Sequence, residues 1–180
     1  PLINPTIVLT VNVKGRRTSD ANVPEIIQSS TERTIKIASD LLLAPRVVYF
    51  AGPISNSGPL PPKADKETAY TVIWTLTNSS NAASNITVTA SLPSSVRFTG
   101  NTSPASFGKG ESLVFNPIGG TITWSLDNVP AGVGFTRPPR EVAFQIGFTP
   151  SLSQVGVTPV LLNEQTVQGF DQFTETPITT

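Results

Sequence analysis

The chain of 180 residues contains no cysteine, no histidine and no methionine. Without cysteine the fold has no disulfides, and without cysteine and histidine it lacks the usual nucleophile–base pairs and zinc ligands. We therefore expect no enzymatic activity and no cofactor. A chain this resistant to oxidation suits an extracellular, cell-surface location better than the cytosol. The absence of an initiator methionine predicts that the segment is processed or excised from a longer chain.

Charge is also scarce. Charged residues make up 13% of the chain, and 12 basic residues balance 12 acidic ones. This balance leaves no electrostatic footprint for nucleic acid or for an anionic membrane surface. No apolar run approaches the ~20 residues that a membrane-spanning helix needs. We expect no nucleic-acid partner and no membrane span within this segment.

What the chain does contain is alternation of apolar and polar residues, with turns rich in Asn, Ser, Gly and Pro. The clearest alternating segments are residues 70–76, 86–92, 122–126 and 142–148. Each has one face for a core and one for water. Seven to eight short strands at this spacing predict an all-β, immunoglobulin-like antiparallel β-sandwich over residues 39–180. Pro45, inside an expected strand at 41–50, predicts either an edge position for that strand or a switch between the two sheets.

Residues 1–38 form a separate part of the predicted structure. Two strands are expected there, at 6–14 and 33–38, joined by a connection that is long for a hairpin. A two-stranded ribbon is marginal in water, so this N-terminal β arm needs a partner: its own sandwich, the end of an upstream repeat, or a neighbouring subunit to which a strand is donated. The predicted interaction residues are Ile7, Leu9, Val11, Val13, Ile35 and Ile37.

Several segments of the sandwich resemble a known family. They are Tyr70-Thr-Val-Ile-Trp-Thr-Leu-Thr-Asn78, Asn85-Ile-Thr-Val-Thr-Ala-Ser-Leu-Pro93, Val96-Arg-Phe98 and Thr121-Ile-Thr-Trp-Ser-Leu126 followed by Val129-Pro-Ala-Gly132. In this order, over about residues 40–150, they resemble the DUF11-type immunoglobulin-like repeat domain of large bacterial cell-surface proteins. One departure is that Ala90 or Ser91 stands where the family often has Asp, so a calcium or isopeptide role of that Asp is not carried over. The resemblance implies a multi-domain, envelope-anchored surface protein.

Two tryptophans and several charged residues are candidate sites. Trp74 and Trp124 lie in the inward-facing phase of their strands, which predicts core residues and not a carbohydrate platform. The cluster at 63–67 is interpreted as a solvated turn before a strand, with a cation or partner site as the alternative. Basic concentrations such as those at 15–17 and 137–140 usually cap loop ends or pair with scattered carboxylates. No calcium site is predicted, because the acidic residues Asp127, Glu141, Asp171 and Glu175 stand singly.

Three functions remain in order of preference. The first is a structural cell-surface protein, either a stiff spacer or a subunit of a filament or surface layer, assembling by strand exchange with copies of itself or with adjacent immunoglobulin-like repeats and serving adhesion to another cell surface. The second is a carbohydrate- or protein-binding accessory module that uses the loops at 52–63 and 130–140. The third is a hydrolase with paired carboxylates, which no strand phase supports.

Overall fold

The computed structural model describes residues 2–16 and 26–180, and almost all of its regular structure is β-strand. The only helix in these ranges is a single 3₁₀ turn, η1 (Leu152–Gln154). Within the same ranges, no helix is long and apolar enough to cross a membrane.

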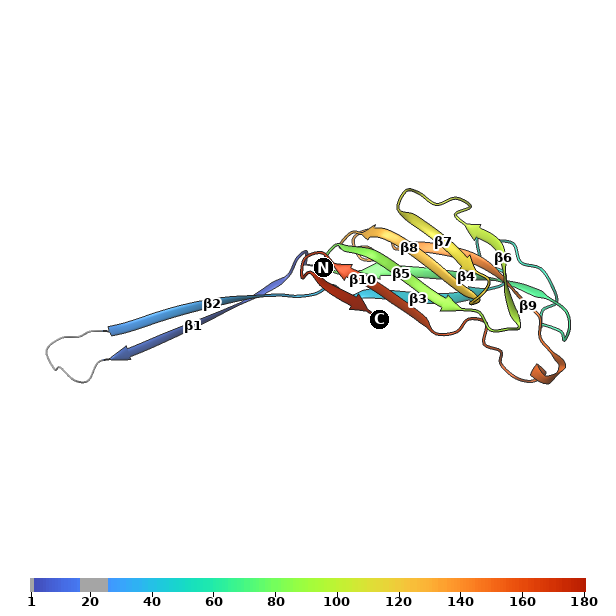
Figure 1. Cartoon of the computed structure of the whole chain (residues 1–180), viewed down its shortest axis with the longest axis horizontal. Helices are drawn as coiled ribbons and strands as arrows, with labels where there is room; N and C mark the ends of the chain where they lie inside the picture. The colour runs from blue at the N-terminus through green and yellow to red at the C-terminus, as the bar shows by residue number, and fades with distance from the viewer. Residues whose placement is uncertain (1, 17–25) are drawn as a thin grey trace.

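The strands divide into an arm and a sandwich, which Figure 1 shows as a long ribbon extending from one end of a two-layered body. The arm consists of β1 (Thr6–Arg16) and β2 (Ile26–Lys36). The sandwich consists of β3 (Leu41–Val48), β4 (Thr68–Asn78), β5 (Ala83–Ser91), β6 (Val96–Ser103), β7 (Glu111–Asn116), β8 (Thr121–Val129), β9 (Arg140–Phe148), β10 (Gln165–Asp171) and β11 (Thr176–Thr179).

The sandwich pairs a four-stranded sheet with a five-stranded one, and all strand pairings are antiparallel. The strand orders are β3-β4-β9-β6 and β11-β10-β5-β8-β7. The predicted immunoglobulin-like sandwich with an extra two-stranded arm is confirmed. Its ninth strand is the short β11, which the sequence pattern did not indicate.

The core forms where the alternating positions of both sheets meet. Trp74 and Trp124 are fully buried, which confirms them as core residues. The Trp74 ring meets Phe144 edge-on, with ring centroids 4.9 Å apart. Edge-to-face contacts of this kind add to the stabilisation from area burial. The two tryptophans come from different sheets, so they tie the layers together.

The edge position that Pro45 predicts is also confirmed. Pro45 lies on β3, which is an edge strand of its sheet. An edge strand tolerates proline because its outer side lacks a hydrogen-bonding partner. Gly120 has a φ of 59°, in the left-handed region that glycine adopts at no steric cost, and it completes the turn between β7 and β8.

The predicted bounds of the second arm strand were wrong. We expected residues 33–38, whereas β2 covers Ile26–Lys36 and pairs along its whole length with β1, from Thr6↔Lys36 to Arg16↔Ile26. Polar residues such as Ser29 and Ser30 hide the strand from a hydropathy pattern, while the ladder to β1 satisfies their backbone groups. Because β2 begins at Ile26, the connection between the arm strands is shorter than expected. Residues 17–25, which form it, lie outside the described residues.

Candidate assembly interface

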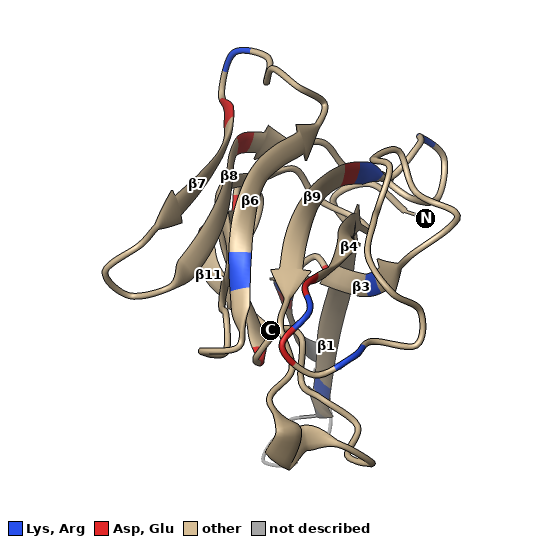
Figure 2. Cartoon of the chain, turned by 90° about the vertical axis from the view of Figure 1, so that its right-hand side faces the viewer, with Lys and Arg blue, Asp and Glu red and all other residues tan. Residues whose placement is uncertain are grey.

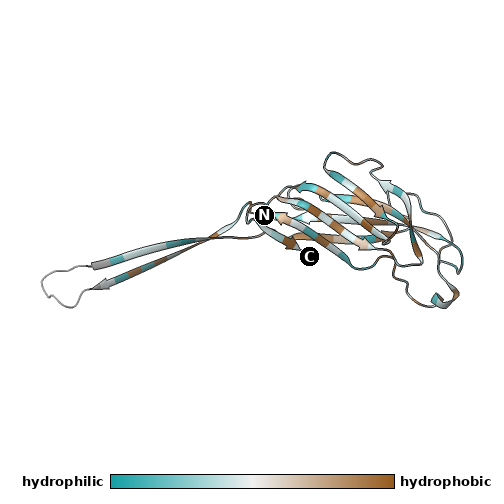
Figure 3. Cartoon of the chain, in the orientation of Figure 1, coloured by the Kyte–Doolittle hydropathy of each residue, from teal (hydrophilic) through white to brown (hydrophobic). Residues whose placement is uncertain are grey.

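The arm has one apolar face. Register places Ile7 opposite Ile35, and Leu9, Val11 and Val13 follow on the same side of β1. We call Ile7, Leu9, Val11, Val13 and Ile35 the apolar stripe. Its side chains are between 47% and 60% exposed, and Figure 3 shows the brown segments along β1. Exposed apolar rows of this kind on a strand pair typically mark an interaction surface.

The opposite face of the arm is mostly polar. There Thr10 lies across from Glu32 and Asn12 across from Ser30, with Val8 as an apolar exception at 53% exposure. The two faces of the ribbon are therefore chemically different, and only one of them offers a continuous apolar surface. This asymmetry gives the arm one apolar side and one mostly polar side.

The base of the arm is fixed to the sandwich by polar contacts. The Lys36 ammonium donates to the Phe173 carbonyl at 2.8 Å and lies 4.9 Å from the centre of the Phe173 ring. Just before β1, the Asn4 backbone amide donates to the Ser80 carbonyl at 3.1 Å. Contacts on both sides of the ribbon restrict its swing relative to the sandwich.

Asp171 is the centre of this base. Its fully buried carboxylate accepts hydrogen bonds from the Ser39 amide at 2.6 Å and from the Asn81 side chain at 2.7 Å, both on Oδ2. The backbone amides of Phe173 and Thr174 donate to Oδ1. Burial alone would raise the pKa of Asp171, but these four hydrogen bonds outweigh it and lower the pKa. The carboxylate therefore stays ionised while joining the end of the arm to β10.

A second buried polar group completes the base. Asn78 is fully buried and donates to the carbonyls of Asn81 and Val129, at 2.7 and 3.0 Å, while it accepts from the Ser39 hydroxyl at 2.5 Å. Buried polar groups that are satisfied in this way specify a single arrangement of the chain. The junction between arm and sandwich is thus built as one hydrogen-bonded unit.

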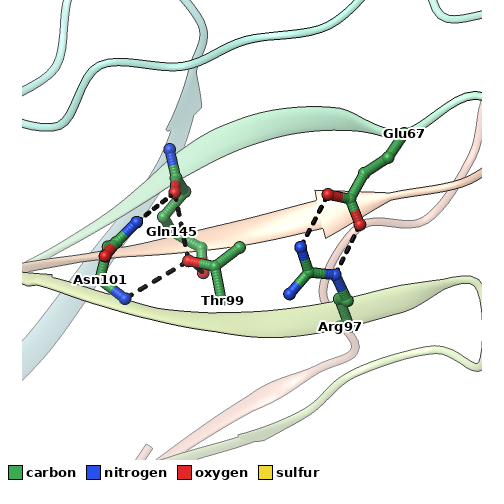
Figure 4. Close-up of polar contacts among 5 residues, drawn as sticks. All are labelled: Glu67, Arg97, Thr99, Asn101 and Gln145. Atoms are coloured by element: carbon green, nitrogen blue, oxygen red, sulfur yellow. Dashed lines mark hydrogen bonds and ion pairs between the residues drawn. The ribbon is translucent and has the colours of Figure 1, made fainter.

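The charged cluster at 63–67 forms an ion pair with a neighbouring strand. Glu67 accepts two hydrogen bonds from Arg97 of β6, at 2.6 and 2.8 Å (Figure 4). The pair lowers the pKa of Glu67, mainly through the hydrogen bond from Arg97. Because both side chains are well exposed, we expect the pair to contribute at most about 1 kcal/mol. The cluster is mostly exposed, as a solvated turn would be. The ion pair between Glu67 and Arg97 was not predicted.

The outer face of β9 carries a polar network beside this pair. Gln145 accepts from Thr99 at 3.2 Å and from Asn101 at 2.8 Å, as Figure 4 shows, and donates to the Ser55 carbonyl at 2.9 Å. The network fixes the loop after β3 over the sheet. Next to it lies an open hollow lined by residues including Pro53, Asn101 and Thr102. Its lining has no aromatic side chain on which a sugar ring would stack.

The remaining charged candidates are dispersed, as the blue and red segments of Figure 2 show. Arg140 of the 137–140 cluster pairs with Glu111, which also accepts from the Trp124 indole at 2.9 Å. Glu141 lies 3.5 Å from Arg46. Over the part of the chain that the structure describes, no group of three or more acidic residues is placed to hold a metal ion. Arg17 lies outside the described residues.

Of the six predicted interaction residues, five form the apolar stripe and the sixth, Ile37, follows β2 at the base with 40% exposure. Their role in assembly stays a prediction. Sequence reasoning missed Asp171 and Asn81, which hold the base. The available signal was weak: Asp171 ends a strand, as many solvent-exposed residues do, and its partners lie about 90 and 132 positions away in sequence.

Comparison with known proteins gives a match in structure alone. No protein-family model matches the chain, so the resemblance to the DUF11-type domain stays a prediction. No curated protein matches it either. Solved structures similar to it include the crystal structure of the major pilin subunit of Bacillus cereus, BcpA, with 13% identity and a TM-score of 0.46. The alignment covers 94% of this chain and 45% of that one, so the chain spans less than half of its length. Similarity at this level carries no information on function.

Proposed function

We propose that this chain is a non-enzymatic structural protein of the cell surface whose arm associates with a further copy of the chain or with an adjacent repeat. In a polymer, the arm of each subunit would engage the next subunit, which produces a filament or a surface layer. In a tandem array, the same contact would stiffen a spacer. Adhesion to another cell surface is the end use that such an array serves.

One observation carries this proposal: an apolar stripe lies on a ribbon that has no core of its own. The two arm strands form a separate two-stranded sheet. The five stripe side chains are about half exposed, and covering them fully would contribute roughly 1 kcal/mol each. The arm is fixed at its base but its apolar stripe is exposed. The arm therefore gains stability when a partner covers the stripe.

The surface location rests on composition and on the resemblance to DUF11-type repeats. A chain with no thiol or thioether has nothing that oxidation readily damages, apart from its aromatic residues. The low charge and the antiparallel β-sandwich fit a repeat of a large exterior protein. These points support the location as part of the proposal.

Sedimentation velocity over a concentration series of the full chain tests the proposal. The expected result is a set of species heavier than the 19.0 kDa monomer that grows with concentration and does not stop at one size. Head-to-tail contacts produce this pattern because each addition leaves a free end. A single 19.0 kDa species at every concentration would remove the polymer version of the proposal.

The accessory-module alternative has weaker support. Trp74 and Trp124 are both fully buried, so neither offers a stacking surface. A carbohydrate site would have to use the polar hollow beside Asn101. Binding of the full chain to a glycan array would favour this alternative, and the same array with no bound glycan would argue against it.

A further inference from the structure

The sandwich is open along one edge, at the second half of β3. The inward row of β3 consists of Leu41, Leu43, Pro45 and Val47. Leu41 itself belongs to the core, and the other three pair with the core residues Leu76, Trp74 and Val72 of β4. Burial decreases along this row: Leu41 is fully buried, whereas Val47 is 41% exposed. The space between the two sheets is therefore less covered at the Val47 end of β3 than at the Leu41 end.

The exposed part of this row borders a groove of about 330 Å³. Its apolar lining comes from one sheet and one loop: Pro45 and Val47 of β3 and Val72 of β4 on one side, and Val160, Leu161 and Leu162 of the loop before β10 on the other. Val72 belongs to the buried core, and Val160 is 59% exposed. The groove therefore leads from an exposed rim to the core. We call these six residues the β3 groove.

The other edges of the sandwich are less suited to a partner. On the opposite side, Phe98 of β6 and Phe115 of β7 close the gap between the sheets, with ring centroids 5.2 Å apart. A register irregularity between Phe98 and Thr102 also interrupts β6. The fourth edge strand, β11, is only four residues long and contains Pro177. The β3 side is thus the edge at which apolar side chains of the inward row are partly exposed.

We propose that the apolar stripe of one copy docks in the β3 groove of the next copy, an inference that rests on the proposed function and names its acceptor surface. The arm of a chain points away from its own sandwich in Figure 1, so its stripe is presented to another molecule. Neighbouring side chains of the stripe are about 7 Å apart along β1, and the chain covers about the same distance from Pro45 to Val47 at the groove. Two successive side chains of the stripe therefore match the groove in spacing and in apolar character.

Charge favours a second copy as the occupant. Residues 1–38 carry five basic and three acidic side chains, whereas residues 39–180 carry seven basic and nine acidic ones. An arm of net positive charge and a sandwich of net negative charge attract each other in a head-to-tail contact, whereas arm against arm repels. The one charged residue that lines the groove, Arg46, lies 3.5 Å from Glu141, which balances its charge, and Glu164 follows Leu162 by two residues. On the arm, Arg33 shares the stripe face opposite Leu9.

Pro45 limits how the contact forms. It has no amide hydrogen, so an uninterrupted ladder cannot extend along the free edge of β3. The contact is therefore made mainly by side chains in the groove. The same proline protects the edge from random pairing with other strands.

Disulfide trapping tests this contact, because the chain has no cysteine of its own. Each of Leu9→Cys, Val11→Cys and Val13→Cys is combined with Val47→Cys, so that the exact register need not be known. The matched control replaces Val47→Cys with Val114→Cys, since Val114 is 58% exposed on β7 at the opposite edge. After mild oxidation, non-reducing electrophoresis counts the covalent species.

The expected result is a ladder of covalent multimers for at least one Val47→Cys combination, at least tenfold stronger than for the Val114→Cys controls. Equal ladders, or a ladder only with Val114→Cys, would overturn the β3 groove as acceptor, while self-association in sedimentation would keep the proposed function. A disulfide within single chains would show that the arm folds back on its own groove, which overturns this inference. Absence of multimers together with a strictly monomeric chain would overturn both.

Discussion

The side-chain amide of Asn81 donates to the Asp171 carboxylate at 2.7 Å and to the Ile37 carbonyl at 2.8 Å. One amide thus joins the start of β5, the end of β10 and the foot of the arm. Because the Ser39 amide donates to the same carboxylate oxygen, the chain is held on both sides of the junction. The direction in which the arm leaves the sandwich depends on this contact.

Replacing Asp171 with Asn should destabilise the fold. An amide at this buried position offers one acceptor oxygen in place of two, which leaves donors such as the Ser39 amide without a partner. We expect the free energy of unfolding to fall by about 1–3 kcal/mol, measured by urea denaturation with tryptophan fluorescence. Glu175→Gln, at an exposed nearby position, is the control and should change stability by less than about 0.5 kcal/mol. Equal effects of both variants would contradict the role of Asp171.

Stability should fall in acid, in part through the same carboxyl. An aspartate in an unfolded chain titrates near pH 3.9, and the hydrogen bonds keep the pKa of folded Asp171 below its usual value despite burial. The folded state therefore binds fewer protons, so this contribution is complete above about pH 5 and is lost as pH falls through the folded pKa. Urea titrations between pH 7 and 3 should show a smaller loss in Asp171→Asn than in the wild type. Parallel curves for the two proteins would contradict this cause.

The two buried tryptophans should respond differently to replacement by phenylalanine. Trp124 donates to Glu111 at 2.9 Å, whereas the Trp74 indole nitrogen is buried with no partner among the described residues. Trp124→Phe removes a satisfied hydrogen bond to a carboxylate, and Trp74→Phe removes an unsatisfied donor. We expect Trp124→Phe to cost about 1–2 kcal/mol more, measured as the midpoint shift in urea. The reverse order would contradict the assignment of these contacts.

Charge on the stripe should abolish self-association without unfolding the sandwich. Val11→Glu places a carboxylate in the middle of the stripe, and Val8→Glu places it on the opposite face; the two positions are 54% and 53% exposed. We expect Val11→Glu to remove the heavier species in sedimentation velocity and Val8→Glu to keep most of them. Both variants should keep the urea midpoint of the wild type, because exposed substitutions change stability little. Equal loss in both would show that the stripe has no defined side.

Alternation was a sufficient guide wherever one face of a strand meets the core. It placed Trp74 and Trp124 correctly, and Pro45 indicated an edge strand because proline lacks the donor that a central ladder requires. It failed for Ser29 and Ser30, whose strand conformation comes from pairing with β1 and not from burial.

The base of the arm escaped sequence reasoning for a different reason. The environment of Asp171 is set by Ser39, which lies 132 positions away along the chain, and by Asn81, which lies 90 positions away. No local pattern reports such contacts, since polar residues at strand ends are usually solvated. The open side of the sandwich is equally non-local, because Val47 and Leu162 line one groove although they lie far apart in sequence.

The central claim is that the arm joins copies of this chain through its apolar stripe. Electron microscopy of the full chain at high concentration, with Val11→Glu imaged beside it, tests the claim most directly. The account predicts fibres with one sandwich per repeat for the wild type, each bridged to the next by an arm, and separate particles for Val11→Glu. Separate single sandwiches in both samples, or identical fibres in both, would contradict it.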